Sequence, residues 1–200
     1  MLPWGHLAVG YLGYTVLTRA RTRRPPAGVP VLVLAVATQL PDLVDKPLNW
    51  WFGVFDGRGI GHSLVAVAVV CLLAVLVARR YDRPALTGAL SIGLFSHLCA
   101  DAWRPLVAGR FERATFLLWP LLPVPTYSTD SLGGHLGSWL AHLRLLPVSP
   151  LEFLTSGFGV QLALFSVVFG VWGLDGFPGL GTTRRLLTRR SSDSTVDTER

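Results

Sequence analysis

The chain has 200 residues, half of them apolar and only 15% charged, and its formal net charge is +6. This composition is typical of an integral membrane protein rather than of a water-soluble domain. The positive charge comes from arginines, with Lys46 as the single lysine, and no aromatic stacking platform or basic recognition helix accompanies them. Nucleic acid is therefore not an expected partner, whereas anionic membrane lipids are.

Five apolar stretches predict an all-α, polytopic membrane helix bundle with about five transmembrane helices. A helix needs roughly 20 apolar residues to cross a bilayer core about 30 Å thick, and the third and fifth stretches are the clearest candidates. The first two are shorter and need their flanks or their neighbours to complete a crossing. In chain order the stretches are residues 2–17, 29–40, 60–78, 86–100 and 156–174.

A further apolar segment, residues 116–125, is short and broken by prolines. We expect it to be re-entrant or interfacial rather than a crossing, because irregular backbone is not stable in contact with lipid chains.

The arginines predict the topology, because they gather in clusters at residues 19–24, 79–83 and 184–190. By the positive-inside rule such clusters stay in the cytoplasm. If the first stretch runs from outside to inside, five alternating crossings bring all three clusters to the cytoplasmic side. We therefore expect a multi-pass protein of the cell membrane, with one domain over residues 1–181. Residues 182–200 are expected to form a basic, then polar, disordered tail in the cytoplasm.

Six side chains with metal-ligand chemistry lie at or near the ends of these stretches, and the expected topology brings all of them to the outer face. Ionisable groups at membrane depth are costly, so they are rare and have partners. A shared divalent metal ion would be such a partner. Zinc suits this set best, and manganese or iron are alternatives. The six side chains are those of His6, Asp42, Asp45, His62, His97 and Asp101.

The strongest local motif is His97 with Asp101, because residues four apart share one face of a helix. Pro41 is expected to end a helix and to direct Asp42 and Asp45 into a loop on the same side of the membrane. Each motif alone has an ordinary structural explanation, such as a hydrogen-bonded helix pair or a helix end. Their common face favours the metal site.

Three imidazoles and up to three carboxylates suit one or two such ions, and two ions would clamp a phosphoester and activate a water. Gly59 and Gly61 precede His62, where the backbone can approach a ligand closely. His6 is expected to complete or bridge a second metal site, and Asp45 to act as general base. The expected ligands of the first ion are His62, His97, Asp101 and Asp42.

Four arginines fall on the outer side, against the usual bias, so something must hold them there. A substrate phosphate or the phosphates of lipids would do so, because arginine binds phosphate through paired hydrogen bonds. Arg104 follows the His97 and Asp101 motif most closely and is the expected substrate contact. The four are Arg58, Arg104, Arg110 and Arg113.

Five short motifs follow one another in the chain: Trp4-Gly5-His6, Pro41-Asp42-Leu43-Val44-Asp45, Gly61-His62-Ser63-Leu64, Ser96-His97 with Asp101, and Leu118-Trp119-Pro120. In this order they resemble a family of membrane-bound, metal-dependent hydrolases, whose bacterial members include a LexA-regulated inner-membrane protein. The resemblance covers residues 4–125. It implies a multi-pass helical protein in which the six side chains named above serve metal-dependent hydrolysis. The chain has Gly57-Arg58-Gly59 where that family has His-Arg-Gly, so one further ligand or phosphate contact is absent.

A second similarity, limited to residue types and the His-x-x-x-Asp spacing, is to zinc-dependent phospholipases C and related nucleases, and it indicates phosphoester hydrolysis. We therefore expect a membrane-embedded, metal-dependent hydrolase acting on a phosphoester or lipid headgroup at the extracytoplasmic face. The main alternative is a non-enzymatic protein, ion-translocating or scaffolding, that uses the polar cluster for helix packing or cation binding. A serine hydrolase using Ser63 or Ser96 is a weaker alternative, because neither serine lies in a nucleophile turn. The sequence does not indicate an oligomeric state.

Overall fold

The computed structural model describes residues 1–26, 28–126, 131–145 and 149–184. Within these ranges the chain is helical and has no strand, which confirms the expected all-α class. Three short 3-10 helices lie between the α-helices. The elements are α1 (Pro3–Thr22), α2 (Val29–Ala37), α3 (Leu40–Phe52), η1 (Ile60–His62), α4 (Leu64–Tyr81), α5 (Pro84–Val107), η2 (Phe111–Arg113), η3 (Thr115–Leu118), α6 (Leu132–Leu145), α7 (Pro150–Thr155) and α8 (Gly157–Leu174).

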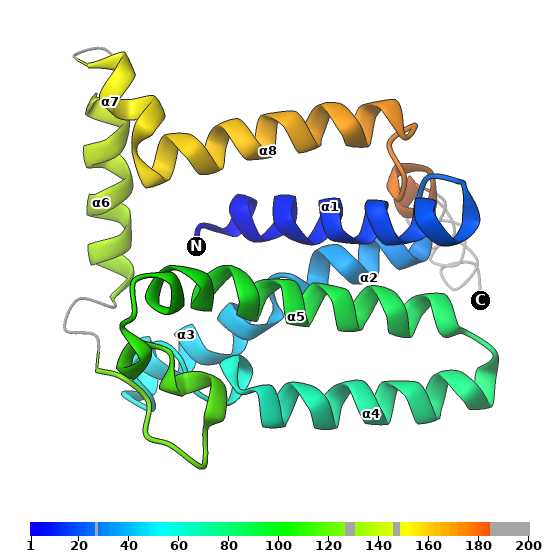
Figure 1. The fold of residues 1–200 in the computed structure, drawn as a ribbon, viewed down its shortest axis with the longest axis horizontal. Helices are drawn as coiled ribbons and strands as arrows, with labels where there is room; N and C mark the ends of the chain where they lie inside the picture. Colours follow the sequence, from blue (N-terminus) through cyan, green and yellow to red (C-terminus); the bar gives the residue numbers. More distant parts are fainter. Residues whose placement is uncertain (27, 127–130, 146–148, 185–200) are drawn as a thin grey trace, which may run out of the picture.

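Three of the described helices, α4, α5 and α8, are long and apolar enough to cross a membrane. Helices α1 and α2 lie along the same direction as these three (Figure 1). With nine residues, α2 extends over about 14 Å, less than half of a bilayer core. The structure thus supports a helical membrane protein with three candidate spans among the described residues. The count of five crossings stays a prediction that depends on α1 and on α2 together with α3.

The two ends of the bundle differ in charge. One end collects the C-terminal end of α1, the turn between α4 and α5, and the C-terminal end of α8 (Figure 1). The arginine clusters at residues 19–24 and 79–83 belong to that end, as the topology prediction requires. Residues 180–184 are still helical, and the rest of the expected tail, residues 185–200, lies outside the described residues.

A break separates α2 from α3. Pro41 has no N–H to donate to the carbonyl four residues earlier, which weakens a continuous helix at this position and favours a break before it. Pro41 lies instead in the first turn of α3, where proline is tolerated because the N–H groups there have no helical partner. The expectation that Asp42 and Asp45 follow Pro41 into a loop is therefore wrong. Both are helical, and their spacing of three residues places them on one face of α3.

Helix α5 lies in the centre and packs against α1, α2 and α4. It approaches α2 closely at Gly93. A Cβ atom there would lie 2.5 Å from the Cβ of Ala37 and 3.0 Å from the carbonyl oxygen of Leu34. Glycine is required at this position because any side chain would push the two helices apart.

The proline-broken segment 116–125 does not form a helical crossing. It begins in η3, where the ring of the buried Phe116 lies 5.9 Å from that of His62, and it has no helix beyond Leu118. Helix α6 lies across the end of the bundle (Figure 1), where Trp139 packs on Trp4 at the start of α1 with ring centroids 5.9 Å apart. These two segments cover the end of the bundle opposite the arginine clusters.

Candidate metal centre

The six predicted side chains converge at the covered end of the bundle. His6 comes from the first turn of α1, His62 from η1 and the two aspartates 42 and 45 from α3, while His97 and Asp101 are one turn apart on α5. The three histidines and Asp45 are fully buried, and Asp101 is 8% exposed. Two overlapping groups in this region can hold a metal ion, namely His6, Asp42 and His97, and His62, His97 and Asp101. We refer to these five residues as the His–Asp cluster.

Asp45 orients His62. Its Oδ2 lies 2.7 Å from the Nδ1 of His62, and a carboxylate can only accept, so Nδ1 carries the proton. The backbone N–H groups of Gly59, Gly61 and His62 donate to the same carboxylate at 2.6, 2.9 and 3.1 Å. Gly61 is needed here for close approach to α3 rather than to a ligand, because a Cβ atom would lie 2.7 Å from the carbonyl oxygen of Pro41.

His97 is oriented by the backbone. Its Nδ1 lies 2.7 Å from the carbonyl oxygen of Thr38, which again can only accept a proton. This carbonyl is available because Thr38 lies in the break between α2 and α3. An imidazole whose Nδ1 proton is held by an oxygen presents the lone pair of Nε2, which is the usual arrangement of histidine ligands to metals.

The two lone pairs face each other. The Nε2 atoms of His62 and His97 lie 3.1 Å apart, and two neutral rings in these tautomers would bring no proton between them. Nitrogen ligands of a tetrahedral zinc ion, with bonds of roughly 2.0–2.1 Å, lie about 3.3–3.4 Å apart. The separation therefore suits a shared cation.

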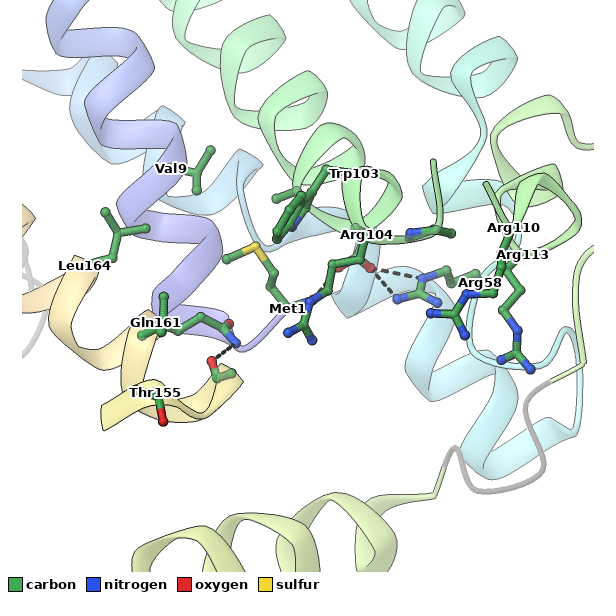
Figure 2. Close-up of a pocket in the computed structure, with 15 residues that line it drawn as sticks. Met1, Val9, Arg58, Trp103, Arg104, Arg110, Arg113, Thr155, Gln161 and Leu164 are labelled. Carbon is green, nitrogen blue, oxygen red and sulfur yellow. Dashed lines mark hydrogen bonds and ion pairs between the residues drawn. The ribbon is translucent and has the colours of Figure 1, made fainter. Parts of the chain in front are cut away.

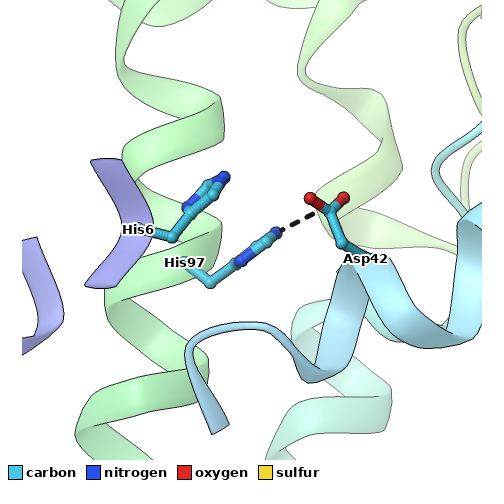
Figure 3. Close-up of side chains that lie close together, drawn as sticks. All are labelled: His6, Asp42 and His97. Carbon is cyan, nitrogen blue, oxygen red and sulfur yellow. Dashed lines mark ion pairs between the residues drawn. The ribbon is translucent and has the colours of Figure 1, made fainter. Parts of the chain in front are cut away.

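Two carboxylates surround this point. The Oδ1 of Asp42 lies 3.9 Å from the Nε2 of His97, as Figure 3 shows for this pair. The same oxygen lies 3.6 Å from the Nε2 of His62. On the other side, the Oδ2 of Asp101 lies 3.5 Å from the Nε2 of His62. These separations are too long for direct hydrogen bonds but are compatible with oxygen and nitrogen ligands arranged around one ion.

His6 has no hydrogen bond to any residue that the structure describes, although both of its ring nitrogens are buried. Its ring stacks on that of His97, with centroids 3.7 Å apart, and its Nε2 lies 3.5 Å from the Oδ1 of Asp101. The Met1 ammonium group also contacts that oxygen. A buried imidazole without partners is rare in folded proteins, because desolvation is then uncompensated. An ion would provide the partner.

Two groups of the cluster lie outside the helices that can span the membrane, and both favour positive charge nearby. Burial lowers the pKa of His62, but the carboxylates of Asp101 and Asp45 outweigh it and raise the pKa above its ordinary value. Burial raises the pKa of Asp42, but the ammonium of Lys46, 2.7 Å away, and the two histidines bring it below its usual value. A proton or a metal ion between the rings can carry this positive charge.

Arg58 and Arg104 lie on the other side of Asp101. The Nε and Nη2 of Arg58 donate to the Oδ2 of Asp101 at 3.0 and 2.8 Å. Arg104, the expected substrate contact, lines a cavity that Asp101 and Arg58 also line (Figure 2). The sequence did not indicate the Arg58–Asp101 pair or the role of the Thr38 carbonyl, since both depend on segments brought together by the fold.

Neither serine of the weaker alternative is placed for catalysis. The Ser63 hydroxyl caps α4 and donates to the carbonyl of Trp119. The Ser96 hydroxyl donates to the carbonyl of Gly93 at 2.9 Å. Both hydroxyls are thus bonded to backbone rather than to a histidine base, which disfavours the serine hydrolase.

A family model described as YdjM inner membrane protein matches residues 1–174. No curated protein and no solved structure matches the chain. The matched range contains every residue of the His–Asp cluster and of the adjoining cavity.

Proposed function

We propose that this chain, which belongs to the YdjM inner membrane protein family, is a metal-dependent hydrolase that acts on a phosphoester or lipid headgroup. The divalent ion is held by the His–Asp cluster, and the donor set suits zinc best, with manganese or iron as alternatives. The positive-inside rule assigns the arginine clusters to the cytoplasmic side. The His–Asp cluster lies at the opposite end of the bundle, so we assign it to the extracytoplasmic face.

One observation carries the proposal: the Nε2 atoms of His62 and His97 face each other at 3.1 Å while oxygen atoms accept both Nδ1 protons. A proton on one ring would satisfy that contact, but it would leave both nitrogens of His6 without a partner. Metal binding also gives His6 a role, because His6 forms one candidate ligand group with Asp42 and His97, while His62 forms the other with His97 and Asp101.

When bound, such an ion polarises a phosphoryl oxygen and lowers the pKa of water. The chain's own residues position the reacting groups. Asp45 and the Thr38 carbonyl hold two imidazoles in the ligand tautomer. We assign Asp45 this positioning role in place of general base, because it is fully buried and its carboxylate already accepts four hydrogen bonds from the segment between Gly59 and His62. Arg104 stays the proposed contact to the substrate phosphate.

Elemental analysis of the detergent-purified full chain, after dialysis against metal-free buffer, tests the metal site. We expect near-stoichiometric transition metal in the wild type, and its loss in His97→Ala and Asp101→Ala. His142→Ala is the matched control, because His142 lies on α6 and stacks on Phe158, outside the cluster. A folded wild type that neither carries nor takes up a metal would overturn the proposal. The cluster would then be a helix-packing network.

Hydrolysis needs its own measurement, with p-nitrophenyl phosphate and lipid phosphoesters as substrates. Activity that a chelator abolishes and added metal restores is the expected result. A metal-loaded protein without turnover on these substrates would favour the non-enzymatic alternative, a cation site within a membrane scaffold.

The orientation is tested by cysteine labelling in intact cells, after Cys71 and Cys99 are replaced by alanine. A membrane-impermeant maleimide should label the Asp56→Cys variant, in the loop before η1. It should label the Asp82→Cys variant, in the turn between α4 and α5, only after the cells are opened. The reverse pattern would place the cluster at the cytoplasmic face.

A further inference from the structure

A cavity of about 780 Å³ adjoins the His–Asp cluster, and Asp101 lines both. The character of its lining changes along its length. Four arginines line it, Arg58, Arg104, Arg110 and Arg113, and so do the apolar side chains of Val9 on α1 and of Val160 and Leu164 on α8, with Gln161 beside them. Figure 2 shows Arg58, Arg110 and Arg113 on one side of the cavity and Val9 and Leu164 on the opposite side, with Arg104 between them. The cavity is therefore amphipathic, with a cationic end and an apolar end.

The cationic end has an excess of positive charge. Asp101 is the one carboxylate among the described residues that line the cavity, and Arg58 already donates two hydrogen bonds to it. In the described part of the chain, Arg104 and Arg110 form no ion pair. Guanidinium groups that share a partly enclosed space repel one another unless an anion lies between them.

The first turn of α8 adds to this positive field. A Cβ atom on Gly157 would lie 3.2 Å from the Nη2 of Arg104, so the guanidinium lies directly against the start of the helix. Helix α8 has 18 residues and begins there, and a helix N-terminus carries partial positive charge. Arginine side chains and a helix N-terminus are both groups that bind phosphate oxygens.

We propose that this cavity binds the phosphate group of an amphiphilic phosphoester. The phosphate lies between Arg104, Arg110 and the start of α8, and the apolar chain lies against Val9, Val160 and Leu164. The role of this molecule as substrate rests on the proposed function. Asp101 lines both the cavity and the His–Asp cluster, so a phosphate bound in the cavity would lie next to the metal site. Binding itself does not require the metal.

The test measures lipid retention by the full chain in detergent, with a chelator present, using native mass spectrometry. The ligands are phosphatidic acid, phosphatidylglycerol and phosphatidylcholine with the same acyl chains. We expect phosphatidic acid to be retained about ten-fold better than phosphatidylcholine, and the variant R104Q/R110Q to lose about ten-fold or more of that binding. The matched control is R79Q/R80Q, which removes the same charge at the other end of the bundle and should bind as the wild type does.

A second variant and a second ligand identify the source of the phosphate. Val160→Phe fills the apolar end and should reduce lipid retention while inorganic phosphate still protects the variant against thermal unfolding. If inorganic phosphate protects the wild type but the three lipids are retained equally, the ligand is a free phosphate, and the proposal of an amphiphilic ligand is overturned. Equal retention of all three lipids without phosphate protection, or an equal loss in R79Q/R80Q, would overturn the site altogether.

His97→Ala separates this inference from the proposed function. The variant should lose metal but keep phosphatidic acid, because the arginine end of the cavity does not include His97. If the wild type binds no metal yet retains phosphatidic acid through Arg104 and Arg110, the hydrolase proposal fails and the binding site stands.

Discussion

Helices α4 and α5 are neighbours in the chain and pack against each other, yet their surroundings are opposite. In the most apolar 18-residue window of each helix, 11% of the residues are buried in α4 and 44% in α5. Val69, Leu73 and Leu76 on α4 are more than half exposed, whereas α5 is enclosed by α1, α2 and α4 and carries His97 and Asp101. A helix that faces lipid needs only apolar side chains. An enclosed helix can hold polar groups because its neighbours provide their partners.

The largest expected difference is between Asp101→Ala on α5 and Leu76→Ala on α4. Removal of one partner of a buried charge pair costs about 3–5 kcal/mol, and Asp101 pairs with Arg58. Leu76 is 53% exposed, so its truncation should change the free energy of unfolding by about 0.5 kcal/mol. Thermal unfolding in detergent measures both variants. Equal losses would show that the two helices are not distinct environments.

A smaller effect is expected within α5, between its own enclosed and open faces. Gly93→Ala should destabilise by about 1–3 kcal/mol, because overpacking moves the backbones of α2 and α5 apart. At Gly88, on the same helix, a Cβ atom meets nothing within 4 Å. Gly88→Ala should therefore be neutral or stabilise by about 0.5–1 kcal/mol, since alanine favours helix. Thermal unfolding in detergent measures the stability of both variants. A destabilisation shared by both variants would point to helix flexibility rather than close packing.

The two ends of the bundle should differ in their effect on metal binding. Asp45→Asn, at the cluster, should weaken metal affinity by about 10–100-fold, because the residue that orients a histidine ligand is lost. Asp82 lies in the turn at the other end with φ of 50°, a conformation that asparagine adopts readily, so Asp82→Asn is a matched control. Competitive titration with a chromophoric chelator measures both. Unchanged affinity in Asp45→Asn would remove the positioning role.

The smallest expected effect concerns the two thiols. Cys99 on the enclosed helix α5 is exposed, whereas Cys71 on the outer helix α4 is buried. N-ethylmaleimide should therefore label Cys99 several-fold faster than Cys71 in detergent-solubilised protein, because access limits the reaction of thiols with similar chemistry. Mass spectrometry of the labelled peptides provides the rates. Faster labelling of Cys71 would contradict the packing of α4 against α5.

The sequence was sufficient to predict the helical class and the convergence of the cluster. The histidines and aspartates lie at the ends of apolar stretches, and if these stretches cross the membrane in alternating directions, the side chains lie at one depth in it. The four-residue spacing of His97 and Asp101 also indicated their shared helix face. The sequence placed the end of the fourth apolar stretch at residue 100, because the charged Asp101 and Arg104 resemble residues at a membrane interface. In the structure the helix continues to Val107. The charge of Asp101 is compensated by Arg58, a partner 43 residues away in the chain.

The roles within the cluster could not be predicted, because they depend on contacts between distant segments. Asp45 and Asp42 are three residues apart on the same helix, yet the backbone N–H groups before His62 enclose only Asp45. The availability of the Thr38 carbonyl likewise depends on where α2 and α3 separate. No local pattern around Thr38 distinguishes an acceptor for His97 from an ordinary residue at a helix end.

The break between α2 and α3 constrains the order in which the protein assembles. Within hydrocarbon no water can replace a missing partner of the Thr38 carbonyl, and its donor, His97, is synthesised 59 residues later in the chain. If α2 and α3 together cross the membrane, this carbonyl therefore has no partner until α5 is in place. A chain truncated before α5 should then leave the segment of α2 and α3 incompletely inserted.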